Sequence, residues 1–335
     1  MSTTNGTPDL TVDDLDRLTK VADPELRVIS APDLMRRQFA PIRWAVPGLI
    51  TEGVTLLSGR PKMGKSWICL DLGIAVASGG MVMGSIHVDP GDVLYCALED
   101  GQRRLQERLK RLLTYEQPTP ERLHFATNWE RLDDGGIDAL EDWRNQHPDT
   151  RLIILDTYAK IRPTPRAGGQ LYQEDYSSLD PLGTWSRSNH IGVLVVHHSR
   201  KAGADDVMDD ISGSTGLSGT VDGLMVLRRA RGEAEAELHV TNRDAPDQEL
   251  ALRWDSDGTR WSIAGSAEDS RINQEHKRIL NLIAASADGL TPKEVSDRLE
   301  GANEATIRKT LRRMLEKGQI RMSDQRYVIP TASVA

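Results

Sequence analysis

The most informative segment of this chain is Gly59-Arg60-Pro61-Lys62-Met63-Gly64-Lys65-Ser66. It fits the pattern G-x-x-x-x-G-K-[ST], with the apolar run VTLLS before it and the helical run Trp67–Ala77 after it. Strand, glycine-rich turn and helix form the context in which this pattern binds phosphate. The glycines let the backbone curl until successive N–H groups point at phosphate oxygens. We therefore expect these eight residues and Trp67 to surround a nucleoside triphosphate.

Three side chains have predicted roles at this phosphate site. Lys65 would reach the β- and γ-phosphates, and the Ser66 hydroxyl would ligate Mg²⁺. A partner carboxylate for the metal should end a buried strand, and the run RLIILD ends in Asp156. The start of the helix after Ser66 adds a partial positive charge. The expected cofactors are therefore ATP and Mg²⁺.

A second acidic residue follows the run DVLYCALE, which ends in Glu99. A carboxylate beside the γ-phosphate can take the proton of an attacking water. The residues alone leave an alternative open, in which Glu99 and Asp100 only favour the N-terminus of the next helix.

Short apolar runs alternate with amphipathic stretches from Val54 onward. The runs are VTLLSG, DVLYCALE, RLIILDT, IGVLVVHH and DGLMVLRR, and Gln102–Leu113 has helical spacing. Continuous apolar strands between helices predict an α/β fold with a mostly parallel sheet covered on both faces. After Arg229 the segments AELHVTNRD, ELALRWD and RWSIAG alternate apolar and polar residues. They predict antiparallel strands at an edge of this sheet.

The charge of the chain is unevenly distributed. The 335 residues carry a net charge of -8, but residues 271–335 hold 12 basic and 8 acidic side chains, a net of +4. The rest holds 30 basic and 42 acidic side chains, a net of -12. An acidic body with a basic end suggests nucleic-acid binding at that end. We expect an arm or linker at 1–40, an ATPase domain at 41–264, a linker at 264–271 and a DNA-binding domain at 272–332.

Other features exclude classes of protein. No run approaches the ~18 apolar residues of a membrane span, and the N-terminus lacks the pattern of a secretory signal. Cys69 and Cys96 lie inside apolar runs, as buried free thiols of a cytoplasmic protein would. His197 and His198 are adjacent on a strand and point to opposite faces, so we reject a shared metal ion.

The basic end has the pattern of three helices and a hairpin, which resembles a winged helix. The expected helices are Asn273–Ser286, one starting at the capping box Thr291-Pro292-Lys293-Glu294, and Asn303–Lys317, with a turn of the hairpin at Ser323-Asp324. The third helix would enter the major groove through Arg308, Lys309, Arg312 and Arg313, while Arg321 and Arg326 on the wing would touch the backbone. A winged helix used for protein contacts remains the alternative.

Several blocks in order resemble one family, the RepA-like ATPases. The blocks are RWAVPGLITEGVTLLSGRPKMGKSW, YCALEDGQRRLQERLKRL, LIILDT, VLVVHHSRKAG and SGSTGLSGTVDGLMVLRR, over roughly Arg43–Ser262. This family is a branch of the RecA-like superfamily that includes ring-forming replicative helicases of plasmids and phages. The resemblance implies a RecA-like core, a homo-oligomeric ring expected to be a hexamer, and ATP hydrolysis coupled to DNA translocation or unwinding.

The resemblance also implies roles for individual residues. Glu99 would be the catalytic base, His198 the γ-phosphate sensor, and Arg243 the arginine finger that acts on a neighbouring subunit. The sequence departs from the helicase pattern at Thr241, where a lysine is usual. Arg228 and Arg229 are the alternative fingers, and surface salt bridges are the plain alternative.

The resemblance further implies that two loops, at 162–176 and 199–215, line a channel for single-stranded DNA. Arg166, Arg200 and Lys201 are the basic residues that would contact phosphates. The second loop also carries Asp205, Asp206, Asp209 and Asp210, which would repel DNA. That loop is alternatively a segment that orders when ATP or a neighbour binds. For the whole chain, an ATP-controlled DNA-binding regulator, or an accessory to recombination or helicase loading, is the alternative to a helicase.

Overall fold

The computed structural model of this chain describes residues 28–113, 118–164, 178–198, 215–229, 233–256, 259–286, 288–299 and 303–330. It contains two compact units, Met1–Arg43 and Trp44–Ala335. In the first unit the described part holds one short helix, α2 (Ala31–Arg36), whose N-cap Ser30 accepts a hydrogen bond from the Asp33 amide at 3.2 Å. None of its residues is buried.

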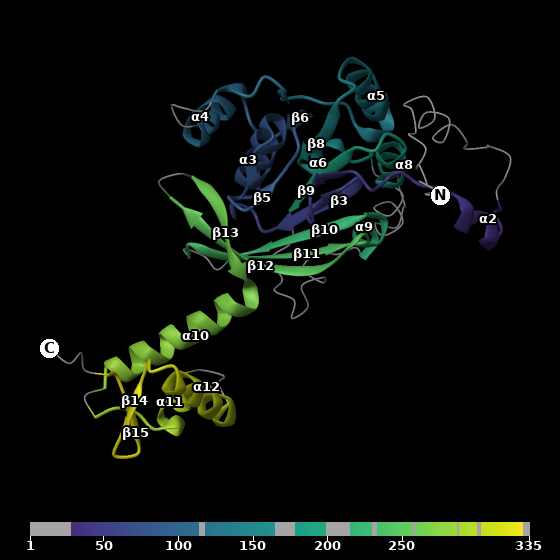
Figure 1. Cartoon of the computed structure of the whole chain (residues 1–335). Coiled ribbons are helices and arrows are strands. Elements are labelled where there is room, and N and C mark those ends of the chain that lie inside the picture. The colour runs from purple at the N-terminus through teal and green to yellow at the C-terminus, as the bar shows by residue number, and fades with distance from the viewer. Residues whose placement is uncertain are drawn as a thin grey trace, which may run out of the picture. The chain divides into compact units, whose positions relative to one another are not determined.

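The second unit is organised by a nine-stranded sheet (Figure 1). In spatial order its strands are β13 (Arg260–Ser266), β12 (Ala245–Asp255), β11 (Glu235–Asn242), β10 (Gly223–Arg228), β3 (Gly53–Gly59), β9 (Gly192–His198), β8 (Thr150–Asp156), β6 (Asp92–Ala97) and β7 (Leu123–Ala126). The six strands from β10 to β7 are parallel. β11, β12 and β13 continue the sheet as antiparallel strands. The predicted α/β class and its antiparallel edge are confirmed.

The parallel strands are apolar throughout because helices cover both of their faces. Adjacent residues such as Leu56 and Leu57, or Ile153 and Ile154, belong to two separate cores. One core is completed by α3 (Lys65–Ser78) and α4 (Gln102–Leu112). The other is completed by α5 (Ile137–Gln146), α6 (Tyr158–Ile161), α8 (Asp180–Ser188) and α9 (Thr215–Thr220). A run that is apolar at every position therefore fits a strand buried on both sides.

Smaller elements fill the remaining connections. They are the strand pairs β1 (Trp44–Val46) with β2 (Ile50–Thr51) and β4 (Met81–Val82) with β5 (Ile86–His87), and the π-helical turn η1 (Leu132–Gly136). No helix in the described part of the chain has both the length and the apolar character needed to cross a membrane.

The strand order brings the ends of four parallel strands together. β9 stands between β3 and β8, with Gly59 in register with His198. β6 follows β8, with Ala97 in register with Asp156. Because the strands are parallel, their carboxyl ends meet at one edge of the sheet, where open α/β sheets bind ligands.

The linker expected at 264–271 was wrong. β13 continues to Ser266, and α10 (Ala267–Ala284) starts at the next residue. The Ser266 side chain accepts from the Asp269 amide at 3.1 Å, and the first turn contains Glu268 and Asp269. Small polar residues that suggested a flexible connection are instead an N-cap and an acidic first turn.

The C-terminal elements are α10, α11 (Pro292–Arg298), α12 (Glu304–Glu316) and the hairpin of β14 (Arg321–Ser323) and β15 (Arg326–Val328). They share a core of their own, which includes Ile279, Val295, Ile307, Leu311 and Tyr327. The predicted capping box is present, since the Thr291 side chain accepts from the Glu294 amide and the Glu294 carboxylate accepts from the Thr291 amide. The three helices and the hairpin are confirmed as elements.

Candidate nucleotide site

The turn between β3 and α3 has the backbone form that a phosphate cradle requires. Gly64, the N-cap of α3, has φ +98°, and a Cβ there would lie 2.8 Å from Nε1 of Trp261. A side chain at this position would therefore be strained by the backbone and blocked by the indole. The Lys65 ammonium donates to the carbonyls of Gly59 at 2.5 Å and Arg60 at 3.0 Å. The lysine thus lies folded over its own loop.

The Lys65 side chain is suited to an anion. Burial lowers the pKa of Lys65 to about 8, against the opposing influence of Asp156, Cys69 and Glu99. A buried ammonium without a full counter-charge gains strongly from a phosphate placed beside it. The helix N-terminus points to the same place. The cradle therefore fits the phosphates of a nucleotide.

Asp156 ends β8 and is only 5% exposed. The Tyr95 hydroxyl donates to its Oδ2 at 3.0 Å, and the Ser66 side chain forms a second hydrogen bond. Burial raises the pKa of the Asp156 carboxyl, and these two hydrogen bonds oppose the rise. A buried carboxylate beside a serine hydroxyl is a donor set that suits Mg²⁺. The pair predicted to hold the metal, Ser66 and Asp156, is brought together.

Glu99 lies two residues beyond β6 and faces β9. The Thr157 hydroxyl donates to its Oε1 at 3.1 Å, and Nε2 of His198 lies 3.6 Å from its Oε2. Asp100 instead turns to the next helix, where it binds Arg104 at 2.8 Å and also Arg108. α4 starts after Gly101 without a side-chain cap, so neither carboxylate caps it. The helix-terminus alternative thus fits Asp100 and its arginines, while Glu99 faces the nucleotide site.

The two adjacent histidines point to opposite faces of the sheet. His198 lines the pocket, whereas the His197 ring packs edge-on against Tyr158, with centroids 5.9 Å apart. No group of three potential metal-binding side chains occurs among the residues that the structure describes. The rejection of a shared metal ion agrees with this placement.

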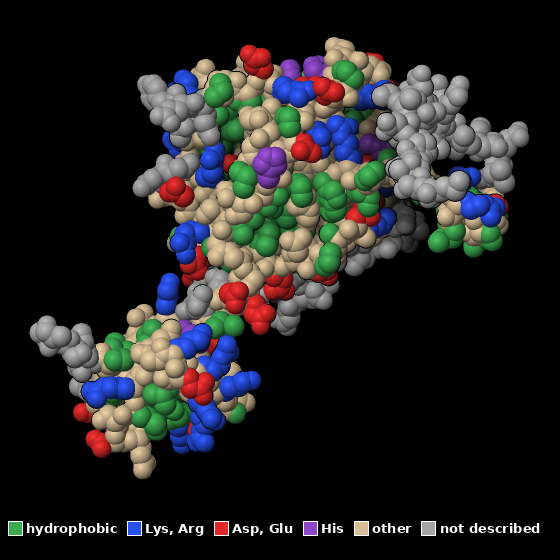
Figure 2. Space-filling model, viewed as in Figure 1, with side chains coloured by type: hydrophobic (Ala, Val, Ile, Leu, Met, Phe, Trp, Pro, Cys, Tyr) green, Lys and Arg blue, Asp and Glu red, His purple; other side chains and the backbone are tan. Residues whose placement is uncertain are grey.

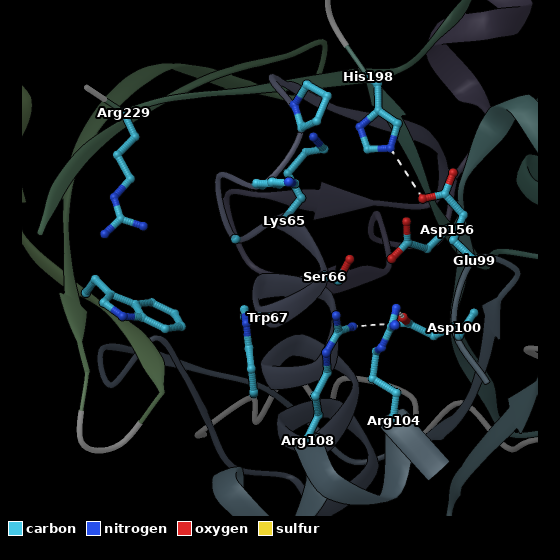
Figure 3. A pocket seen from close by; sticks show the side chains of 15 residues that line it. Lys65, Ser66, Trp67, Glu99, Asp100, Arg104, Arg108, Asp156, His198 and Arg229 are labelled. Atoms are coloured by element: carbon cyan, nitrogen blue, oxygen red, sulfur yellow. Dashed lines mark hydrogen bonds and ion pairs between the residues drawn. The ribbon is translucent and has the colours of Figure 1, made fainter. Parts of the chain in front are cut away.

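These side chains line one pocket of about 620 Å³ (Figure 3). That volume lies within the ~300–1,000 Å³ typical of ligand pockets. Its lining is Pro61, Lys62, Gly64, Lys65, Ser66, Trp67, Ala97, Glu99, Asp100, Arg104, Arg108, Asp156, His198, Arg229 and Trp254. The site residues from β3, β6, β8 and β9 are therefore gathered in one place.

Sequence reasoning missed the pocket roles of Asp100, Arg104, Arg108 and Trp254. A signal for the first three was available, because Asp100, Arg104 and Arg108 are spaced by four and fall on one helix face. Trp254 had no such signal. Its strand was recognised, but only the sheet order brings that strand beside α3.

The arginines considered for a finger lie in different surroundings. Arg243 is half-exposed, binds Asp222 at 3.5 Å and donates to the Gly219 carbonyl at 3.3 Å. Asp222 also binds Arg187 at 2.9 Å. Arg243 is not part of the pocket of its own chain, whereas Arg229 is. Arg228 closes β10 and is partly buried.

The residues expected to contact DNA are only partly described. Arg166, Arg200 and Lys201 lie outside the described residues. Figure 2 shows Lys and Arg side chains gathered on the C-terminal elements. There Arg308 pairs with Glu304 at 2.7 Å, Arg312 with Glu316 at 3.3 Å, and Arg326 with Glu294 at 2.7 Å. Lys309, Arg313 and Arg321 are exposed.

Comparisons with known proteins extend this description. A family model described as an AAA domain matches residues 22–204. No match is found among curated proteins. One similar solved structure is that of an isolated ATPase domain, at 14% identity and TM-score 0.49, covering 63% of this chain and 84% of that one. Another is a DnaB-like replicative helicase, solved for its interactions with primase, at 15% identity and TM-score 0.49, covering 63% of this chain and 57% of that one.

The family match includes the phosphate cradle, Glu99, Asp156 and His198, which the pocket brings together. It covers more than half of the chain. This protein therefore belongs to the AAA domain family and is a P-loop ATPase.

Proposed function

We propose that the chain is a ring-forming DNA motor of the RepA-like branch of the RecA-like ATPases. It hydrolyses ATP and uses the cycle to translocate on DNA or unwind it. The observation that carries the proposal is the position of Glu99, which shares a pocket with Lys65, Ser66 and Asp156 and is held by His198 and Thr157. A partly exposed carboxylate opposite a phosphate cradle is placed to activate water.

The residues divide the chemistry among them. Lys65 and the loop amides bind the β- and γ-phosphates, and Ser66 and Asp156 hold Mg²⁺. When bound, Mg²⁺ neutralises charge on the phosphate oxygens. Glu99 accepts the proton of the attacking water, and Thr157 fixes one of its oxygens through a 3.1 Å hydrogen bond. His198, 3.6 Å from the other oxygen, is placed to respond when the γ-phosphate leaves.

An arginine supplied by a neighbouring subunit would complete the site. Arg243 is the proposed finger, because it is half-exposed and lies away from the pocket of its own chain. Its partner Asp222 would hold it ready, and Gly219 would orient it. Arg229, already in the pocket, is the alternative and would act within its own chain.

The basic C-terminal elements are the proposed duplex-binding part, a winged helix over about residues 272–332. Their separate core supports a domain of their own. Arg308, Lys309, Arg312 and Arg313 lie exposed on α12, and Arg321 is exposed on the hairpin. Phosphate contacts by such residues give binding that weakens steeply with salt.

A second function is favoured by this same arrangement. A DNA-binding module joined to an ATPase core also suits a regulator whose ATP state controls assembly on DNA, or an accessory to recombination or helicase loading. The separate core and the exposed basic face of α12 support that possibility equally well.

One experiment tests the function and separates these two possibilities. ATP hydrolysis and strand displacement on a forked duplex are measured together for the wild type and Lys65→Ala. We expect DNA-stimulated hydrolysis and ATP-dependent unwinding by the wild type, both lost in Lys65→Ala. Normal hydrolysis by Lys65→Ala would contradict the ATPase assignment. Hydrolysis with tight duplex binding but without unwinding would contradict the motor and favour the regulator.

A further inference from the structure

Three tryptophans and two arginines gather where α3 meets the antiparallel edge of the sheet. Trp67 and Trp254 have centroids 6.0 Å apart and Trp254 and Trp261 have centroids 5.2 Å apart, both in edge-to-face geometry. The Arg108 guanidinium lies 5.4 Å from the Trp67 centroid. Arg229 lies 5.9 Å from the Trp254 centroid and 5.0 Å from that of Trp261. The phosphate and water chemistry proposed above uses none of these aromatic rings.

The three indoles differ in what they can reach. Trp261 is only 1% exposed and lies under the cradle, with its ring against Gly64. Trp67 and Trp254 are half-buried and line the pocket itself. Trp67 also follows Ser66 directly, so its ring starts beside the phosphate cradle. Two aromatic surfaces are therefore open to whatever the pocket holds.

This aromatic end lies away from the proposed catalytic end. Figure 3 shows Arg229 and the pair Glu99 and His198 on opposite sides of Lys65. A triphosphate whose γ-phosphate faces Glu99 would extend its nucleoside away from that side. The Trp254 ring lies beneath Arg229, so the nucleoside would meet it there.

We propose that Trp254 and Trp67, flanked by Arg229 and Arg108, form a subsite that holds the nucleobase by stacking. The proposal rests on the proposed function in one respect, namely that the cradle binds a nucleotide. Every base presents a π-face, so a stacking subsite accepts different bases. Arginine guanidinium groups beside the rings add cation–π attraction.

The polar groups at this end leave little capacity to read the edge of a base. Asp100 is engaged by Arg104 and Arg108, and Nε of Arg229 donates to the Glu233 carbonyl at 2.6 Å. Among the described residues that line the pocket, no side chain is an amide, and the hydroxyl of Ser66 belongs to the metal end. A site that hydrogen-bonds its substrate can reject an analogue by ~10⁴-fold or more. Here we expect adenine and guanine nucleotides to bind within about tenfold of each other.

The test compares ligands with and without a base. Affinities of MgADP, MgGDP and inorganic magnesium tripolyphosphate are measured by titration calorimetry for the full-length wild type, Trp254→Leu and Trp254→Phe. Trp143→Leu, which changes a half-buried indole on α5 outside the pocket, is the matched control. Tripolyphosphate reports on the cradle alone, so it reveals any general damage to the fold.

We expect Trp254→Leu to weaken both nucleotides by about tenfold while tripolyphosphate stays within about twofold. Trp254→Phe should recover most of the lost nucleotide affinity, because a phenyl ring still stacks. Equal weakening of nucleotides and tripolyphosphate, unchanged nucleotide affinity in Trp254→Leu, or a wild-type preference for MgADP above about a hundredfold would overturn the subsite. Base-dependent binding by a wild type that does not hydrolyse ATP would support the subsite and contradict the proposed function. A wild type that binds none of the ligands would contradict both.

Discussion

At the scale of single residues, the site depends on charges that burial makes costly. Lys65 is 4% exposed and Asp156 5% exposed, and each is held by a few hydrogen bonds rather than by a close opposite charge. Burial of charged groups shifts pKa values toward the neutral form. Both groups therefore gain from ligands of opposite charge, the phosphates for Lys65 and a cation for Asp156.

The lowered pKa of Lys65, about 8, predicts a pH dependence of nucleotide binding. Below that pH the free protein carries the lysine proton, whereas above it the proton is lost and must be regained when phosphate binds. We expect ADP affinity to fall by up to about tenfold per pH unit above about pH 8. Titration calorimetry between pH 7 and pH 9.5 measures it.

Lys65→Arg is the matched control for this pH dependence. Its guanidinium stays protonated throughout this range, so its ADP affinity should be weaker overall but flat with pH. A wild type as flat as Lys65→Arg would contradict the effect of burial on the lysine.

Some site residues could be read from the sequence and others could not. Lys65, Ser66, Asp156 and Glu99 each end a strand or start a helix, so local pattern located them. Arg229 was named from the sequence only as a possible finger, yet it lies in the pocket of its own chain. Trp254 reaches the same pocket from an edge strand 187 positions after Trp67. Non-local pairing of this kind follows from the sheet order, which a single sequence does not contain.

At the scale of elements, the strands were predictable because both of their faces are buried. β3, β6, β8, β9 and β10 coincide with the five apolar runs to within one or two residues. The start of α10 was not, because Ser266 reads as part of a flexible stretch until its capping bond is seen. Composition alone cannot distinguish a helix N-cap from a linker.

The hairpin of the C-terminal elements carries a prediction that separates stability from DNA binding. Arg326 donates to both oxygens of Glu294 at 2.7 Å, and the pKa of Glu294 is lowered to about 2, first by the Thr291 amide and then by Arg326. A lowered carboxyl pKa stabilises the fold above the unfolded value of 4.5, and this effect is lost as pH falls toward 2. Near neutral pH we expect Arg326→Ala to speed amide hydrogen exchange in α11 of the full-length chain.

Arg313→Ala is the matched comparison, because Arg313 is exposed on α12 and has no role in that capping box. It should leave exchange in α11 unchanged but weaken duplex binding and reduce its salt dependence by about one counterion. Unchanged exchange in Arg326→Ala, together with a loss of DNA binding equal to that of Arg313→Ala, would assign Arg326 to the DNA instead.

At the scale of the whole molecule, the net charge of -8 is an average over unlike parts. The +4 of residues 271–335 coincides with helices and a hairpin that have their own core. The -12 belongs to the remainder, whose sheet carries the ATPase pocket. The assignment of nucleotide chemistry to one part and duplex binding to the other therefore follows the charge as well as the fold.

The central claim is that Glu99 activates water in this pocket, and single-turnover ATP hydrolysis by Glu99→Gln tests it most directly. Glu107→Gln, an exposed change on α4, is the matched control. We predict that Glu99→Gln binds ATP as the wild type does but hydrolyses it about a hundredfold to ten-thousandfold more slowly. Hydrolysis by Glu99→Gln at the rate of Glu107→Gln would contradict the account.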